Sequence, residues 1–154
     1  MALKVSSPGW KSGETIPKKY TGDGADVSPP LVFEGAPIGT KAFAVICDDP
    51  DAPVGTWVHW VIYDVPGGVN GLPEGVPTDG SLPDGSRQGR NSWKKSGYGG
   101  PSPPPGKPHR YFFRLYALRT PLGLGPGLSA KAVETAARGK AIETAQYMGV
   151  YGRP

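Results

Sequence analysis

The amino-acid sequence predicts a mainly β domain. Apolar and aromatic residues gather in short runs, and two of these runs alternate with the period of two that is typical of strands. The 24 glycines and 19 prolines are concentrated between the runs, as turns and loops are in β-rich domains, and this distribution argues against disorder. The 154 residues have the length of a single domain, residues 1–154, which can bury roughly two thirds of its unfolded surface.

The first half of the chain predicts four strands. Residues 3–5 predict a short edge strand, and residues 31–33 predict a brief strand that follows a long Gly- and Pro-rich loop. The almost uninterrupted apolar run of residues 41–47 is typical of a strand covered on both faces. Alternation over residues 57–65 predicts a second central strand. One face of this strand is expected to carry Trp57, His59, Val61, Tyr63 and Val65, and the other Val58, Trp60, Ile62 and Asp64.

The second half predicts a long loop, one strand and two helices. Residues 67–108 contain no convincing helix or strand, and about 40 irregular residues in a compact domain are expected only where the loop is functional. Residues 109–118 alternate clearly, with His109 and Tyr111 on one face. Ser129 is a plausible N-cap for a helix over residues 130–138, with Leu128 and Val133 as a hydrophobic staple. Residues 140–148 predict a second short helix that ends at Gly149.

Composition limits the partners and the location. The formal net charge of +4 and the pI near 9.2 favour anionic partners, but the excess is modest and no nucleic-acid partner is expected. Cys47 is the only cysteine, so neither an intramolecular disulfide nor a cysteine-based zinc site can form. The N-terminus has no apolar signal-like segment and the chain has no apolar run of ~18 residues, so we expect no transmembrane segment and a cytoplasmic protein.

A candidate site begins where the apolar run 41–47 ends. Asp49 has the parity of Phe43, Val45 and Cys47 in that strand. Trp57 and His59 follow it closely in the sequence, and the second histidine, His109, starts another strand. We expect folding to bring these two stretches into one small polar pocket walled by aromatic rings. In the alternative interpretation, Asp48 and Asp51 only shape the proline turn, and His59 is a satisfied core histidine.

Other chemistries have weaker support. Two histidines and an aspartate could ligate a metal, but no close His spacing exists, so neither a metal site nor a cofactor is expected. The chain lacks Gly-x-Ser-x-Gly, GxGxxG and a Walker loop, and the basic segment with Arg87, Arg90, Lys94 and Lys95 is best interpreted as a solvated loop.

The two stretches are similar to the signature regions of a known family. Asp49-Pro50-Asp51-Ala52-Pro53 with Trp57-x-His59-Trp60, and Gly100-Pro101-x-Pro103-Pro104 with Gly106-x-x-His109-Arg110-Tyr111, resemble the phosphatidylethanolamine-binding protein (PEBP) family, in its compact bacterial and archaeal branch. Supporting matches, among them Gly89-x-Asn91 and the closing Gly149-x-Tyr151-x-Arg153, extend the resemblance over nearly the whole chain.

The resemblance implies a fold and a ligand class. The fold would have a large central sheet packed with a smaller one, long Gly/Pro-rich loops and short C-terminal helices. A small pocket would bind anions such as phosphate or a phospholipid headgroup without catalysis. By motif its ligand-binding residues would be Asp49, Trp57, His59, Pro101, His109 and Tyr111, with Asp51, Asn91 and Gly100 in support.

The family also leaves alternatives open. Its members act as inhibitors of serine peptidases or kinases or as signalling scaffolds, so a regulatory role with a peptidase or kinase partner, working through surface loops, is an alternative. An uncharacterised hydrolase is a third hypothesis. Two departures stand out, because many relatives have Cys where this chain has Ser102, and Gly-His where it has Gly139-Lys140. Since histidine has a reference pKa of ~6.5, anion affinity is expected to strengthen as the pH falls from about 8 to 6.

Overall fold

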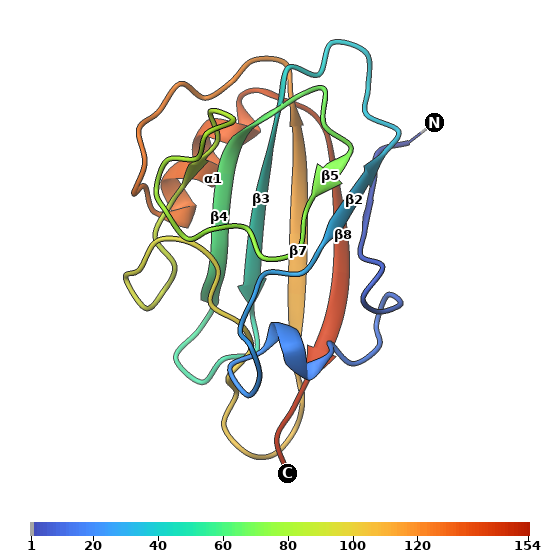
Figure 1. The fold of residues 1–154 in the computed structure, drawn as a ribbon, viewed down its shortest axis with the longest axis vertical. Helices are drawn as coiled ribbons and strands as arrows, with labels where there is room; N and C mark the ends of the chain where they lie inside the picture. Colours follow the sequence, from blue (N-terminus) through green and yellow to red (C-terminus); the bar gives the residue numbers. More distant parts are fainter. Residues whose placement is uncertain (1) are drawn as a thin grey trace.

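The computed structural model describes residues 2–154 and has two antiparallel sheets packed face to face (Figure 1). The predicted domain also includes Met1, which lies outside the described residues. The larger sheet has the order β6-β4-β3-β7-β8 and the smaller one β1-β2-β5. The mainly β fold with a large and a small sheet is thus confirmed. The larger sheet consists of β3 (Ala42–Asp49), β4 (Trp57–Pro66), β6 (Arg87–Gln88), β7 (His109–Leu118) and β8 (Ala141–Tyr151).

The remaining elements cover the two faces of the larger sheet. The smaller sheet, which lies in front of it in Figure 1, consists of β1 (Lys4–Ser6), β2 (Leu31–Glu34) and β5 (Gly71–Leu72). A 3-10 turn, η1 (Lys18–Tyr20), lies near the lower end of the sheet in this view, and helix α1 (Ala130–Arg138) packs on the opposite face. The helix begins as predicted, because the Ser129 Oγ accepts a hydrogen bond from the Ala132 N–H at 3.1 Å.

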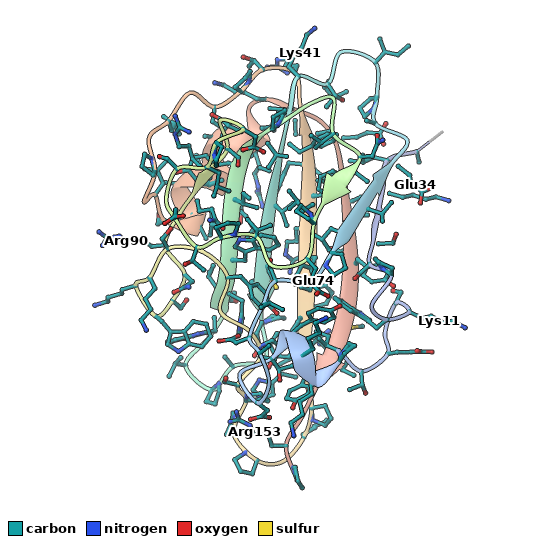
Figure 2. The ribbon with its side chains drawn as sticks, viewed as in Figure 1. Lys11, Glu34, Lys41, Glu74, Arg90 and Arg153 are labelled. Atoms are coloured by element: carbon teal, nitrogen blue, oxygen red, sulfur yellow. The ribbon has the colours of Figure 1, made fainter. Side chains whose placement is uncertain are left out.

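Two apolar clusters hold these layers together. The first lies between the sheets and includes Phe43, Val45 and Phe113, and the second lies between the larger sheet and α1 and includes Ile46 and Val133. Charged side chains such as Lys11, Glu34, Lys41 and Arg90 extend outwards from the periphery (Figure 2). Strand β3 contributes to both clusters, as expected for a strand covered on both faces.

Strand β4 differs from the predicted alternation because it contains two register shifts. Cys47 pairs with Trp60 and Asp48 pairs with Val58, which leaves His59 as an extra residue in a β-bulge. The bulge turns Trp60 and Ile62 towards the space between the sheets, and Val61 and Tyr63 towards α1. The predicted faces were therefore wrong between residues 60 and 63. A second irregularity, where Asp64 has a φ of 55 degrees in the left-handed region, returns Val65 to the first face.

The second predicted helix is wrong, because residues 141–151 form strand β8. This strand pairs antiparallel with β7 from His109↔Tyr151 to Leu118↔Ala141. Its burial alternates, since Ile142, Thr144 and Gln146 are exposed while the residues between them are partly covered. The helix-forming residues of this segment had suggested a helix, but covering the edge of β7 outweighs local propensity.

The long segment 67–108 is irregular, although it contains two short strands that the sequence did not predict. Strands β5 and β6 each have two residues and attach the segment to β2 and β4. In Figure 1 the segment runs over the side of the molecule to the lower end of the larger sheet. No helix among residues 2–154 is long and apolar enough to cross a membrane. The cytoplasmic location stays a prediction.

Candidate functional site

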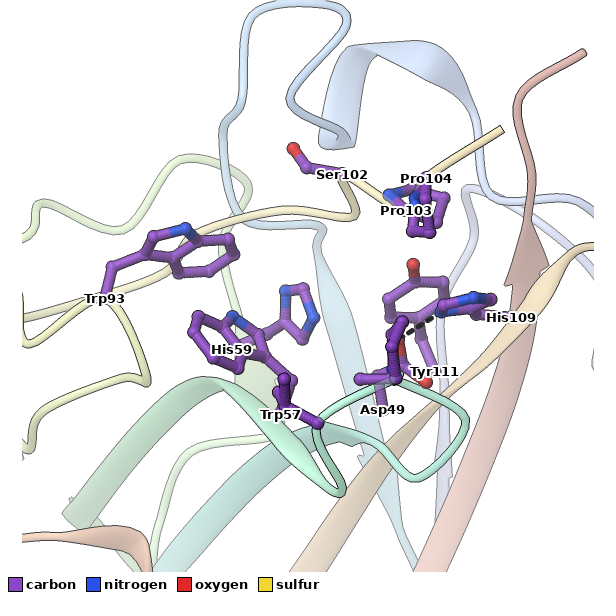
Figure 3. Close-up of a pocket in the computed structure, with 12 residues that line it drawn as sticks. Asp49, Trp57, His59, Trp93, Ser102, Pro103, Pro104, His109 and Tyr111 are labelled. Carbon is purple, nitrogen blue, oxygen red and sulfur yellow. Dashed lines mark hydrogen bonds and ion pairs between the residues drawn. The ribbon is translucent and has the colours of Figure 1, made fainter. Parts of the chain in front are cut away.

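The lower end of the larger sheet brings the two predicted stretches together (Figure 3). Strand β3 lies between β4 and β7 and is antiparallel to both. Its last residue, Asp49, is therefore next to the first residues of its neighbours, Trp57 and His109. Because β7 alternates as predicted, His109 and Tyr111 face the same side of the sheet as Asp49.

Asp49 holds His109 in one orientation. The His109 Nδ1 lies 2.7 Å from the Asp49 Oδ2, and the two residues are only 9% and 3% exposed. The other carboxylate oxygen of Asp49 accepts the N–H of Asp51 at 2.8 Å, which is the geometry of a turn stabilised by an aspartate. Both carboxylate oxygens are thus engaged, so Asp49 acts on its surroundings through the His109 ring.

His59, which lies in the bulge of β4, faces the same place. Its Nδ1 lies 2.7 Å from the carbonyl oxygen of Gly99, and its ring packs edge-on against the rings of Trp93 and Tyr111, each at 5.1 Å between centroids. Burial lowers the pKa of His59, while the Gly99 carbonyl and the Asp49 carboxylate partly oppose this shift. His59 is therefore a buried but hydrogen-bonded histidine on the wall of a pocket.

The lowered pKa of His59 makes a prediction about stability. The folded protein resists protonation of this ring, so its contribution to the free energy of unfolding is present above about pH 6.5 and is lost as the pH falls through the lowered pKa. We expect urea midpoints to fall between pH 7.5 and 5 in the wild type, and to fall less in His59→Gln. Equal pH dependence of the two proteins would contradict this role of His59.

The pocket has a volume of about 190 Å³ and a mainly apolar rim. Trp57, His59, His109, Tyr111 and Asp49 line it, together with further residues from three loops, Ala52, Pro53, Val54, Trp93, Ser102, Pro103 and Pro104. Burial raises the pKa of Tyr111, so its hydroxyl stays protonated and can donate a hydrogen bond.

Four of the predicted residues lie outside the lining of this pocket. Asp51 accepts three hydrogen bonds from Arg110, at 2.8 to 2.9 Å, and thereby ties the proline loop to β7. The Asn91 side chain donates to the Gly97 carbonyl and accepts from the Trp93 N–H, which positions the loop of Trp93. The Gly100 N–H donates to Asp26 Oδ1, and Pro101, which is buried, accepts the Gly22 N–H through its carbonyl.

Sequence reasoning did not assign Trp93, Ser102 or the apolar residues of the proline loop to the pocket. Trp93 lies two residues after Asn91, in the segment interpreted as a solvated loop, and its packing against His59 has no signal in strand parity. The second signature region includes Ser102, Pro103 and Pro104. It was therefore the feature of the sequence that could have placed them in the pocket. Among residues 2–154, no group of three or more His, Cys, Asp or Glu side chains is arranged to hold a metal ion.

Comparison with known proteins agrees with this fold. The family model for phosphatidylethanolamine-binding protein matches residues 6–152, so the chain belongs to that family. A UPF0098 protein of Methanothermobacter thermautotrophicus is 52% identical over 138 residues, which are 90% of this chain and 91% of the relative. A UPF0098 protein of Aquifex aeolicus is 48% identical over 155 residues, which are 98% of this chain and 89% of the relative.

Solved structures extend the comparison to three dimensions. Escherichia coli YbcL, described as a member of the mammalian PEBP family, has a TM-score of 0.92 and 36% identity, and each chain is covered to 100%. The PEBP homologue CT736 of Chlamydia trachomatis has a TM-score of 0.90 and 35% identity, with 99% of each chain covered. The PEBP-type fold is thus shown over the whole described chain.

Proposed function

We propose that the pocket at the lower sheet end binds a small anion, the phosphate group of a phospholipid headgroup or of a related phosphate compound, without catalysing a reaction. One observation carries this proposal. The rings of His59 and His109 are each held through Nδ1, at 2.7 Å in both cases, beside the Tyr111 hydroxyl on one wall of the pocket. Family membership supports a binding role of this kind.

The geometry supports anion binding only if the carboxylate of Asp49 is compensated. Asp49 contacts the Nδ1 edge of the His109 ring, which leaves the Nε2 edge for the ligand. When His109 is protonated, the two side chains form an ion pair. A protonated Nε2–H of either histidine would then donate a charge-assisted hydrogen bond to an anion oxygen. The rings of Trp57 and Trp93 and the prolines line the pocket around that contact.

Removing both histidine side chains should abolish headgroup binding. We expect phosphoethanolamine and inorganic phosphate to change the fluorescence of the wild type, because Trp57 and Trp93 line the pocket. In the variant with both His59→Ala and His109→Ala, the affinity for these two compounds should fall at least tenfold. Lys41→Ala, an exposed change at the opposite end of the sheet, should retain it. Unchanged affinity in a folded double variant would refute the proposal.

The same double variant separates binding from the peptidase- or kinase-inhibitor alternative. If inhibition works through surface loops, it should survive the loss of both histidines while headgroup binding disappears. For the hydrolase alternative, Ser102 lines the pocket, but its hydroxyl makes no hydrogen bond with either histidine in the described chain. A screen of carboxylic and phosphoric esters tests it, because turnover that depends on His109 would contradict a purely binding role.

A further inference from the structure

Both pocket histidines use the same nitrogen for their structural hydrogen bond. The His59 Nδ1 faces a backbone carbonyl oxygen, that of Gly99, and the His109 Nδ1 faces a carboxylate oxygen, that of Asp49. A carbonyl oxygen and an ionised carboxylate can only accept hydrogen bonds, so the proton of each neutral ring is on Nδ1. Each neutral ring therefore has a lone pair on Nε2.

These Nε2 atoms are available to a ligand. Neither Nε2 makes a hydrogen bond with residues 2–154. The one fully buried side-chain N or O atom without a hydrogen-bond partner in the described chain is the Ser96 Oγ, so both Nε2 atoms are accessible. A fully ionised oxyanion also has only acceptor atoms. Neutral histidines and a fully ionised oxyanion consequently repel each other, and a proton must be present between them.

The pocket has no permanent cation that could replace this proton. Its lining, as the described residues define it, contains no lysine or arginine. The charged groups that face His59 are Asp49 and Asp48 of β3, and those that face His109 are Asp49 and Asp51. The nearby guanidinium groups are engaged elsewhere, Arg110 with Asp51 and Arg153 with Asp23. Positive charge reaches the ligand only by protonation of the histidines.

This arrangement narrows the ligand of the proposed function, on which it rests, to compounds such as phosphoethanolamine, and it excludes the phosphodiester of an intact phospholipid, which has no acidic proton. We propose that the pocket selects tetrahedral oxyanions that carry an acidic proton, as phosphate monoesters do, and rejects sulfate monoesters, which carry none. A phosphate monoester has its second pKa near ~6 and therefore brings a P–O–H donor for one Nε2 at near-neutral pH. Its remaining oxygens can accept from the Tyr111 hydroxyl and from the other ring once that ring is protonated.

The test compares methyl phosphate with methyl sulfate, which have the same shape around the central atom. Calorimetric titration of the full chain at pH 6.5 should give an affinity at least tenfold higher for methyl phosphate. At pH 5, below the reference pKa of histidine, the ratio should shrink severalfold as methyl sulfate binding improves. The heat of methyl phosphate binding at pH 6.5 should also depend on the ionisation enthalpy of the buffer, because protons are taken up.

Two variants sharpen the interpretation. His59→Gln replaces the acceptor by an amide that can donate at every pH, so the preference for methyl phosphate at pH 6.5 should fall to below threefold. Lys41→Gln, at the opposite end of the sheet, should keep the tenfold preference. Equal affinities of the wild type for the two esters at pH 6.5 would overturn this inference while anion binding stands. If neither ester nor phosphoethanolamine binds at either pH, the proposed function fails as well.

Discussion

Replacing Gln88 by leucine is expected to lower the free energy of unfolding by about 3 kcal/mol. Gln88 is fully buried, and its Oε1 accepts the indole N–H of Trp60 at 2.7 Å. Its amide nitrogen donates to the carbonyls of Pro77 and Asp79, at 2.7 and 2.8 Å. Leucine removes all three hydrogen bonds and leaves a buried indole donor without a partner, which costs more than the hydrogen bond itself contributes.

A matched substitution separates this effect from the general effect of adding an apolar residue. Gln146 is exposed on β8, so Gln146→Leu is expected to change the free energy of unfolding by less than about 0.5 kcal/mol. Urea unfolding monitored by circular dichroism provides both values, provided that the m-values agree. Similar midpoints for the two variants would show that the Gln88 network does not hold the long loop on β4.

Part of the site could be predicted from the sequence and part could not. Strand parity was sufficient to place Asp49, His109 and Tyr111 on one face. The pairing of β3 with β7 runs without interruption up to Asp48 and Phe112, directly beside these residues. Trp93 reaches the pocket through loop contacts, such as those of Asn91, that have no periodic pattern. Nor can alternation locate a bulge, and Trp60 lies on the same side of the sheet as His59 only because of one.

The fold shows the same division between local and non-local information. The strands that alternate clearly and the helix with its Ser129 cap were predicted, since their signals lie within a few residues of one another. Strand β8 was mistaken for a helix because its Ala, Glu and Gln residues favour a helix in isolation. Its strand conformation depends on β7 and on the N-terminal residues 10–16, which are distant in the sequence.

Strand β8 makes a strong prediction at Gly149. In the structure, the segment containing Trp10 and Ile16 lies directly against this glycine, and a Cβ there would be 2.5 Å from the Ile16 Cγ1 and 2.5 Å from the Trp10 Nε1. Both neighbours are buried, and the segment is fixed to β8 by hydrogen bonds such as Gly13 N–H to the Met148 carbonyl at 2.8 Å. Neither side chain can retreat without breaking the packing around it.

Gly149→Ala is therefore expected to lower the free energy of unfolding by about 2 to 3 kcal/mol through overpacking. Gly139→Ala is the matched control, because its φ is −70 degrees and its Cβ would meet only the Ala136 carbonyl oxygen at 3.7 Å. We expect that control to be neutral or to stabilise by about 0.4 to 1 kcal/mol. A stabilising Gly149→Ala would refute the contact between residues 10–16 and β8, and with it the strand that ends beside the pocket.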